Sequence, residues 1–165
     1  MASHPKLIAA GLLTLACALV LCGCRDATLI SSSMTPSIKR GEKVIVDYTA
    51  YAVGAPKRWD VVAFEPPGRT NEVWVMRIIA LPGETIAFAK GGIAIGGQPL
   101  SLPPHITNVT YVSLDRLQLP SSVASPYLVP LDSFFVLGDN SAHANDSRFW
   151  GAVPRTNIVG KVRDK

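Results

Sequence analysis

The sequence predicts an all-β domain built from a coiled antiparallel sheet or a barrel. Short runs rich in Val, Ile and aromatic residues, which favour strands, recur along the chain. Turn residues separate these runs, as in Pro-Pro-Gly at 66–68 and Leu-Pro-Gly-Glu at 81–84. After residue 25 no segment shows a convincing amphipathic helix pattern. Together these observations favour one all-β domain.

The expected strands follow one another along the domain, at 43–50, 59–64, 73–80 and 85–89. Lys-Gly-Gly at 90–92 separates the fourth run from Ile-Ala-Ile-Gly-Gly, and this arrangement predicts a β-hairpin. Residues 99–130 are rich in Pro and Ser and have little periodicity, so they predict a long irregular loop. Strand character returns at 133–140 and then breaks into a polar loop.

An apolar segment near the N-terminus is suited to a membrane. Residues 7–22 are continuously apolar, and Gly23 and Cys24 can extend them toward the ~20 residues that a spanning helix needs. Because Lys6 precedes this run, the positive-inside tendency places the N-terminus in the cytoplasm and the rest of the chain outside, at the periplasmic or cell-surface side. The expected division is a membrane anchor at 1–24 and an extracytoplasmic domain at 25–165.

The cysteines leave a second interpretation of this segment open. Leu-Cys-Gly-Cys at 21–24 is similar to the lipobox of bacterial lipoproteins, in which Cys24 would become the lipidated N-terminus. Either tether would hold the domain against membrane lipid at the outer face. Residues 25–165 contain no cysteine, so we expect neither a disulfide nor a thiolate metal site in the domain.

Charge and residue pattern argue against a nucleic-acid partner and against a bound metal or other cofactor. The chain carries 16 Lys plus Arg against 12 Asp plus Glu, and the basic residues are scattered along it. A nucleic-acid partner is therefore not expected. The sequence shows no constellation of metal ligands and no glycine-rich phosphate loop, so we expect neither a metal nor another cofactor.

Four segments carry the chemistry of the sequence. Ser-Ser-Ser-Met-Thr-Pro-Ser at 31–37 would by itself be typical of a linker. It is followed by Arg-Trp-Asp-Val-Val-Ala-Phe at 58–64, Met-Arg-Ile-Ile-Ala-Leu-Pro-Gly-Glu at 76–84, and Gly-Asp-Asn-Ser-Ala-His-Ala-Asn-Asp-Ser-Arg-Phe-Trp-Gly at 138–151. In this order they resemble four segments of the bacterial type I signal peptidases. The family's segments are Ser-Met-x-Pro-Thr, Arg-Gly-Asp-Val-Val, Lys-Arg-Val-x-Gly-Leu-Pro-Gly-Asp, and Gly-Asp-Asn followed by Ser-x-Asp-Ser-Arg-x-Trp-Gly. The family's fold is a coiled, mostly antiparallel β structure.

The resemblance implies a serine endopeptidase that cleaves N-terminal signal peptides from exported preproteins at the membrane surface. Ser33 would be the nucleophile, and its backbone N–H would form the oxyanion hole with the hydroxyl of Ser31. Met34 would face the membrane or the substrate. Asp146 and Arg148 would form an ion pair that supports the site; the alternative is a solvated surface pair of little energetic value.

The group that should activate the serine is missing. In the family a lysine next to the arginine of the third segment, here Arg77, is the general base, and the aligned residue is Met76. A thioether is a weak hydrogen-bond acceptor and cannot take the proton of a serine. The serine that holds the family's lysine is replaced by Ala144. Because losing the base lowers kcat on the order of a millionfold, a catalytically impaired protein is expected.

His143 is the candidate for a substitute base. It lies next to Ala144 on the segment that should face Ser33, and an imidazole is the commonest biological base. Asp139 or Asp146 could orient it in a Ser–His–Asp arrangement. The alternative is an exposed loop histidine without a catalytic role.

Other bases are less well placed in the sequence. Nothing in the aligned segments brings His105 near Ser33. Lys39 and Lys43 are close to Ser33 along the chain, but the strand that leaves the loop should carry them away.

Three hypotheses about function follow. The chain is an atypical signal peptidase that uses Ser33 with His143, or an inactive pseudopeptidase that binds signal-peptide-like segments at the membrane surface. The third is a lipidated structural protein that has kept only the fold. Supporting residues in the first two cases are Arg77, Asp139, Asp146 and Arg148.

Overall fold

The computed structural model describes residues 23–69, 71–89, 92–112 and 123–163. The strands of four or more residues are β1 (Cys24–Thr28), β2 (Lys43–Asp47), β3 (Val61–Phe64), β4 (Trp74–Ala80), β5 (Thr85–Ala89), β6 (Gly92–Ile95), β9 (Ser133–Leu137) and β11 (Ile158–Arg163). The two-residue strands are β7 (Gln98–Pro99), β8 (Tyr127–Leu128) and β10 (Val153–Pro154). One helical turn, α1 (Ser147–Trp150), and one 3-10 turn, η2 (Arg155–Asn157), complete these elements.

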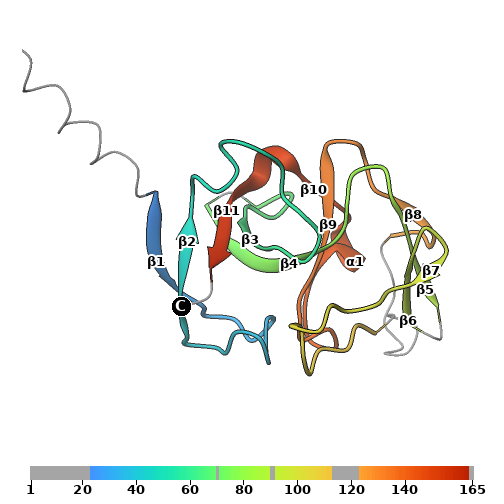
Figure 1. Ribbon diagram of the computed structural model, residues 1–165, viewed down its shortest axis with the longest axis horizontal. Coiled ribbons are helices and arrows are strands. Elements are labelled where there is room, and N and C mark those ends of the chain that lie inside the picture. Colours follow the sequence, from blue (N-terminus) through green and yellow to red (C-terminus); the bar gives the residue numbers. More distant parts are fainter. Residues whose placement is uncertain (1–22, 70, 90–91, 113–122, 164–165) are drawn as a thin grey trace, which may run out of the picture.

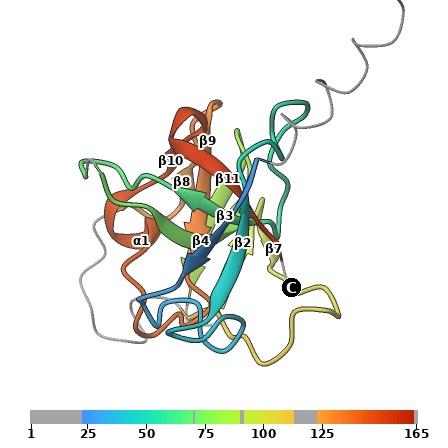
Figure 2. The same cartoon turned by 90° about the vertical axis from the view of Figure 1, so that its left-hand side faces the viewer.

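The strands form two antiparallel sheets, so the all-β prediction is confirmed (Figure 1). The larger sheet has seven strands in the order β1-β2-β11-β3-β4-β9-β10, and the smaller has four in the order β7-β6-β5-β8. In Figure 1, β1 and β2 lie at one end of the molecule and the four-stranded sheet at the other. Figure 2 shows β1 and β2 side by side, with β11 next to them in the sheet.

Most of the expected strands are present. The four runs predicted in the first half contain β2, β3, β4 and β5, and the run at 133–140 contains β9. The predicted hairpin joins β5 to β6, with Ile86 opposite Ile95. The irregular segment 99–130 also contributes β8, which pairs with β5. The sequence pattern does not predict β1 or β11, although β11 lies between β2 and β3 and joins the end of the domain to its beginning.

Two clusters of buried apolar side chains lie on opposite faces of the central strands. Val136 of β9 belongs to the first cluster, whereas its neighbours Phe135 and Leu137 belong to the second. Successive residues of a strand point to opposite faces, so β9 is covered on both sides. This explains why its sequence is continuously apolar instead of alternating. The segment with His143 and Ala144 follows β9 along the chain, and Met76 lies within β4.

The predicted membrane segment falls on residues that the structure mostly does not describe, since the described part begins at Gly23. Within the described part, the helical elements are too short and too polar to cross a bilayer. Cys24, the last residue of the expected tether, is the first residue of β1 and lies opposite Asp47 of β2.

Candidate active site

The loop that carries Ser33 is held by two successive turns. The N–H of Thr35 donates to the carbonyl of Ser32 at 3.1 Å, and the N–H of Ile38 donates to the carbonyl of Met34 at 2.9 Å. Met34 is fully buried in the first core cluster, so the expectation that it faces the membrane or the substrate is wrong. Its side chain fixes the loop to the core, while the Ser33 residue next to it remains half-buried at the surface.

The two predicted oxyanion donors lie together. The backbone N–H of Ser33 donates to the Oγ of Ser31 at 3.1 Å, and Ser31 itself is exposed. In this conformation the Ser33 N–H is bonded to the Ser31 hydroxyl, so the two groups would have to separate before both could donate to the oxyanion of a substrate.

The last sequence segment is fastened directly to the Ser33 loop. The backbone N–H of Asn140 donates to the carbonyl of Ser33 at 2.9 Å, and the Asn140 side-chain amide donates to the carbonyl of Ser32 at 3.1 Å. Gly138 is equally close, because a Cβ at this position would lie 2.6 Å from the Ser33 oxygen and 2.4 Å from the Ala144 Cβ. The backbone contact therefore requires glycine here. The two segments meet as the sequence resemblance predicts.

The position at which the resemblance expects a base is apolar and buried. Met76 lies in β4 opposite Val62 and is 2% exposed, and it packs in the same core cluster as Met34. Ala144 is 5% exposed and lies against Gly138. A thioether and a methyl group thus occupy the positions that the resemblance would assign to a lysine and a hydroxyl, and neither can take up a proton.

His143 contacts Asn140 and not the predicted carboxylates. Its ring Nδ1 lies 3.1 Å from the Oδ1 of Asn140, and its backbone N–H donates to the Asn140 carbonyl at 2.9 Å. Asp139 and Asp146 are instead bound by Arg77 and Arg148, as described below. The structure therefore brings His143 to the Ser33 loop through Asn140, and the expected Ser–His–Asp arrangement is not formed.

Arg77 and Asp139 form a buried pair beneath the loop. The Arg77 Nε and Nη2 donate to the two carboxylate oxygens at 3.0 and 2.6 Å, and the hydroxyl of Tyr111 donates to the same carboxylate at 2.6 Å. Burial lowers the pKa of Arg77, but the bonds to Asp139 outweigh it and raise the pKa above its usual value. Burial, followed by the Asp139 charge, raises the pKa of Tyr111. Arg77 also donates to the Oγ of Ser37, which joins the pair to the Ser33 loop.

Asp146 and Arg148 form a second, fully buried pair. The Arg148 Nε and Nη2 each donate to one carboxylate oxygen at 2.8 Å, and both side chains have 0% exposure. The pair is therefore not a solvated surface pair, and its role in supporting the site is structural. Arg148 further donates to the carbonyls of Ser141 and Val112, and Asp146 accepts from the N–H of Gly138. Burial raises the pKa of Asp146, and the contact with Arg148 opposes this shift.

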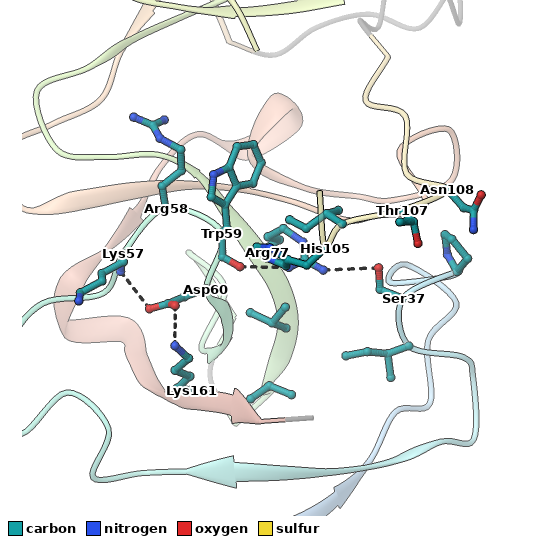
Figure 3. A pocket seen from close by; sticks show the side chains of 15 residues that line it. Ser37, Lys57, Arg58, Trp59, Asp60, Arg77, His105, Thr107, Asn108 and Lys161 are labelled. Carbon is teal, nitrogen blue, oxygen red and sulfur yellow. Dashed lines mark hydrogen bonds and ion pairs between the residues drawn. The ribbon is translucent and has the colours of Figure 1, made fainter. Parts of the chain in front are cut away.

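A cavity of about 660 Å³ adjoins the site (Figure 3). One wall is formed by Pro36, Ser37 and Ile38, which directly continue the Ser33 loop. Figure 3 shows Arg77 between Ser37 and the carbonyl of Trp59, together with His105 near the centre of the view. His105 thus lies nearer to the Ser33 loop than its sequence context suggests.

The remaining predicted bases are placed at the surface. Lys39 and Lys43 are both exposed, and Lys43 lies in β2 opposite Thr28. Among the described residues, no group of three or more His, Cys, Asp or Glu side chains is arranged to hold a metal ion.

Sequence reasoning missed two residues of the site. Asn140 contacts both the Ser33 loop and His143, and the sequence marks it only as a polar residue of the Gly-Asp-Asn pattern beside the end of a predicted strand. Tyr111 lies in the Pro- and Ser-rich segment that predicts an irregular loop, and no periodicity there marks it as buried. Only the tertiary fold brings Tyr111 to Asp139.

The comparisons with known proteins agree with this geometry. The family model described as "Signal peptidase, peptidase S26" matches residues 5–164. A signal peptidase I from Leptolyngbya laminosa is 37% identical over 139 residues, which cover 80% of this chain and 63% of that protein. A probable signal peptidase I-1 from Synechocystis sp. is 31% identical over 137 residues, covering 79% of this chain and 64% of that protein. Signal peptidase IB from Staphylococcus aureus is 29% identical over 142 residues, covering 82% and 73%.

A solved structure is also similar. The crystal structure of a signal peptidase I from Enterococcus faecalis V583 superposes with a TM-score of 0.50 and 30% identity, covering 67% of this chain and 99% of that chain. The chain spans less than two thirds of the length of the first two relatives named above. The order of the four segments, the antiparallel sheets and the match along nearly the whole sequence lead to one conclusion: the chain belongs to the signal peptidase family, peptidase S26.

Proposed function

We propose that this chain is a signal peptidase I-like serine endopeptidase that cleaves N-terminal signal peptides from exported preproteins. Ser33 is the nucleophile, and Ser31 and the Ser33 N–H bind the oxyanion. The observation that carries this proposal is the fastening of the Ser33 loop to the last segment through Asn140 and Gly138, which keeps the nucleophile at the surface. The family membership supports the substrate class.

The protein acts beside a membrane in this proposal, with residues 1–24 as its anchor or lipidated tether. The signal peptide's apolar region would lie in the same bilayer as the tether. In this proposal the domain lies on the extracytoplasmic side, where the cleavage sites of exported chains emerge.

A second function is favoured by the closed, apolar base position. With Met76 and Ala144 buried at the family's lysine and serine positions, the chain would bind signal-peptide-like segments without cleaving them. Such a pseudopeptidase would keep the Ser33 loop as part of a binding surface. Residual catalysis from an oxyanion hole and binding alone is ~10³ to 10⁴ over water, which is too slow to process secreted proteins.

One experiment separates the two functions. The full chain in detergent is mixed with a preprotein whose signal ends in Ala-x-Ala, and cleavage is followed for the native chain and for Ser33→Ala. Ser101→Ala is the matched control, because it makes the same change at an exposed serine that follows β7 of the smaller sheet. Cleavage that is lost only in Ser33→Ala supports the peptidase. Equal and negligible cleavage, with signal peptide still bound in an equilibrium binding assay, supports the pseudopeptidase.

A further inference from the structure

We infer that Asn140 is a positioning residue that sets the tautomer of His143, so that His143 presents the lone pair of Nε2 as the general base for Ser33. The inference rests on the proposed peptidase function and assigns its missing base. The carrying observation is the 3.1 Å contact between the Asn140 Oδ1 and the His143 Nδ1. No carboxylate takes part in it.

The orientation of the Asn140 amide is fixed by its other end. The amide Nδ2 donates to the carbonyl of Ser32 at 3.1 Å, and a carbonyl oxygen can only accept. The atom that faces His143 is therefore Oδ1, which also can only accept. The Nδ1 of His143 must then carry the proton of this hydrogen bond. In a neutral imidazole with Nδ1 protonated, the lone pair is at Nε2.

The same asparagine links the backbone of His143 to the backbone of the Ser33 loop. Its backbone N–H donates to the carbonyl of Ser33 at 2.9 Å, and the N–H of His143 closes a turn onto the Asn140 carbonyl at 2.9 Å. The histidine is thus attached to the residue that holds the Ser33 loop. An amide oxygen that orients a catalytic histidine is chemically sufficient, since Cys-His-Asn sites work in this way.

The two carboxylates of the last segment and the side chain at position 76 are not available as the base. The carboxylates of Asp139 and Asp146 are both engaged by buried arginines. The side chain at position 76 is a buried thioether. His143 is exposed and held on only one ring nitrogen by the described contacts, so its Nε2 is open to a substrate complex.

The reaction balances with water as the only co-reactant. Nε2 takes the hydroxyl proton of Ser33 as its Oγ bonds to the scissile carbonyl carbon, and the carbonyl electrons move onto the oxyanion. The imidazolium then gives this proton to the leaving nitrogen as the C–N bond breaks, which leaves an acyl-enzyme ester. Water repeats both steps, and the acyl group leaves as the carboxylate end of the signal peptide.

The test measures the tautomer and the cleavage rate on the same variants of the full chain in detergent. The ring ¹⁵N shifts of His143 report the tautomer, and the signal is assigned by its loss in His143→Ala, since the chain has only 3 histidines. We expect Nδ1–H in the native chain and a shift toward Nε2–H in Asn140→Ala. Asn140→Asp keeps the acceptor, so the Nδ1–H form persists.

Cleavage should follow the tautomer. Asn140→Ala and His143→Ala should each lower kcat ~10²-fold or more with KM nearly unchanged, because a wrong tautomer in a serine peptidase costs up to ~10⁴. Asn140→Asp should recover most of the loss. If Asn140 only held the loop, Asn140→Asp would instead cleave more slowly than Asn140→Ala, because a carboxylate facing the Ser32 carbonyl would weaken that contact further.

Three results would overturn the inference. The first is an unchanged tautomer in Asn140→Ala, and the second is Ser33-dependent cleavage that His143→Ala leaves intact. The third is Asn140→Asp cleaving as slowly as Asn140→Ala. If the native chain does not cleave at all, the proposed function fails together with the base assignment, whereas the ¹⁵N shifts still decide whether Asn140 sets the tautomer.

Discussion

At the scale of single residues, the most informative positions are those where this chain departs from its family's pattern. Met76 and Ala144, the positions that the resemblance assigns to the family's lysine and serine, are both buried and apolar. A lysine at position 76 alone would be buried among apolar side chains, and its ammonium would lack a hydroxyl partner. The two positions therefore have to be changed together.

This leads to a prediction for restored catalysis. In the His143→Ala background, the double change Met76→Lys with Ala144→Ser should raise preprotein cleavage by ~10² to 10⁴-fold, the usual contribution of a positioned general base. Cleavage by the double and single variants is compared at equal protein concentration. Met76→Lys alone should gain less and melt at a lower temperature. A folded double variant that cleaves no faster than its background would contradict the base position assigned to residue 76.

Trp59 is the second departure at this scale. The family's segment has glycine at this position, and Trp59 has φ of +76°, a left-handed conformation that costs a side-chain-bearing residue roughly 1–2 kcal/mol. Its backbone is held there on both sides, because its N–H donates to the carbonyl of Ile78 and its carbonyl accepts from Arg77. The strain is maintained by the sheet and the buried arginine.

The strain can be measured by comparing two truncations. Trp59→Gly and Trp59→Ala lose the same packing, but glycine adopts positive φ without penalty. We expect Trp59→Gly to be more stable than Trp59→Ala by about 1 kcal/mol in urea unfolding. The same pair of changes at Val53, an exposed loop residue without positive φ, should show the reverse order. Glycine being less stable than alanine at position 59 would contradict the strain.

At the scale of elements, the sequence predicted the strands whose runs are largely apolar and missed two of mixed composition: the exposed edge strand β1, and β11, in which the buried Ile158 and Val162 alternate with less buried residues. The runs containing β2, β4 and β9 are apolar because they are buried, so their composition indicates strands. In β1, by contrast, Arg25, Asp26 and Thr28 are exposed, and an edge strand of this composition has no hydrophobic alternation. It exists through its ladder to β2, which no local pattern encodes.

The site followed the same division. The family's motif order predicted that the Ser33 loop and the last segment meet, and the Gly138 contact shows that they do. The partner of His143 was not predictable in the same way, because Asp139 lies four positions from it in the sequence and Asp146 and Asn140 each lie three. Asp139 is bound by Arg77 of β4 and Asp146 by Arg148 of the same segment, and only the fold shows that Asn140 is the residue that contacts the histidine.

The α1 turn offers a test of the buried pair that supports the site. Arg148→Met removes the cation and leaves Asp146 buried without a counter-charge, so it should destabilise the protein by about 3–5 kcal/mol. The free energy of unfolding is measured by urea titration. Arg69→Met is the matched control, because Arg69 pairs with Glu72 at an exposed position and should cost about 1 kcal/mol or less. Similar losses in both variants would mean that the Asp146 pair is solvated in solution.

At the scale of the whole molecule, Asp60 joins three segments that are distant in the sequence. It accepts from the hydroxyl of Tyr51 at 2.9 Å and from the N–H of Lys57 at 3.0 Å, and it pairs with Lys161 of β11 at 2.6 Å. The ion pair with Lys161 links the last strand, β11, to Asp60, which directly precedes β3. This contact therefore contributes to the closure of the domain around the site.

Asp60 makes the stability of the domain depend on pH. Burial raises its pKa, but the bonds from Lys161, Lys57 and Tyr51 outweigh burial and lower the pKa below its usual value. An aspartate with a lowered folded-state pKa stabilises the fold above its unfolded value of about 3.9, and this contribution is lost as the pH falls through the folded value. The stabilising contacts are thus complete at neutral pH and disappear in acid.

The prediction concerns the slope of stability against pH. At pH 7, Asp60→Asn should cost about 1–3 kcal/mol, because it removes charged hydrogen bonds from a largely buried carboxylate. Between about pH 5 and pH 3, however, the variant should lose less stability than the native chain, so that the two unfolding curves converge in acid. Lys161→Met should reduce the slope only in part, since Tyr51 and the Lys57 N–H still bind the carboxylate. Urea titrations at several pH values measure all three proteins. Native and Asp60→Asn curves that stay parallel down to pH 3 would show that Asp60 titrates alike in the folded and unfolded chains, and that closure of the domain relies on the backbone ladder of β11 alone.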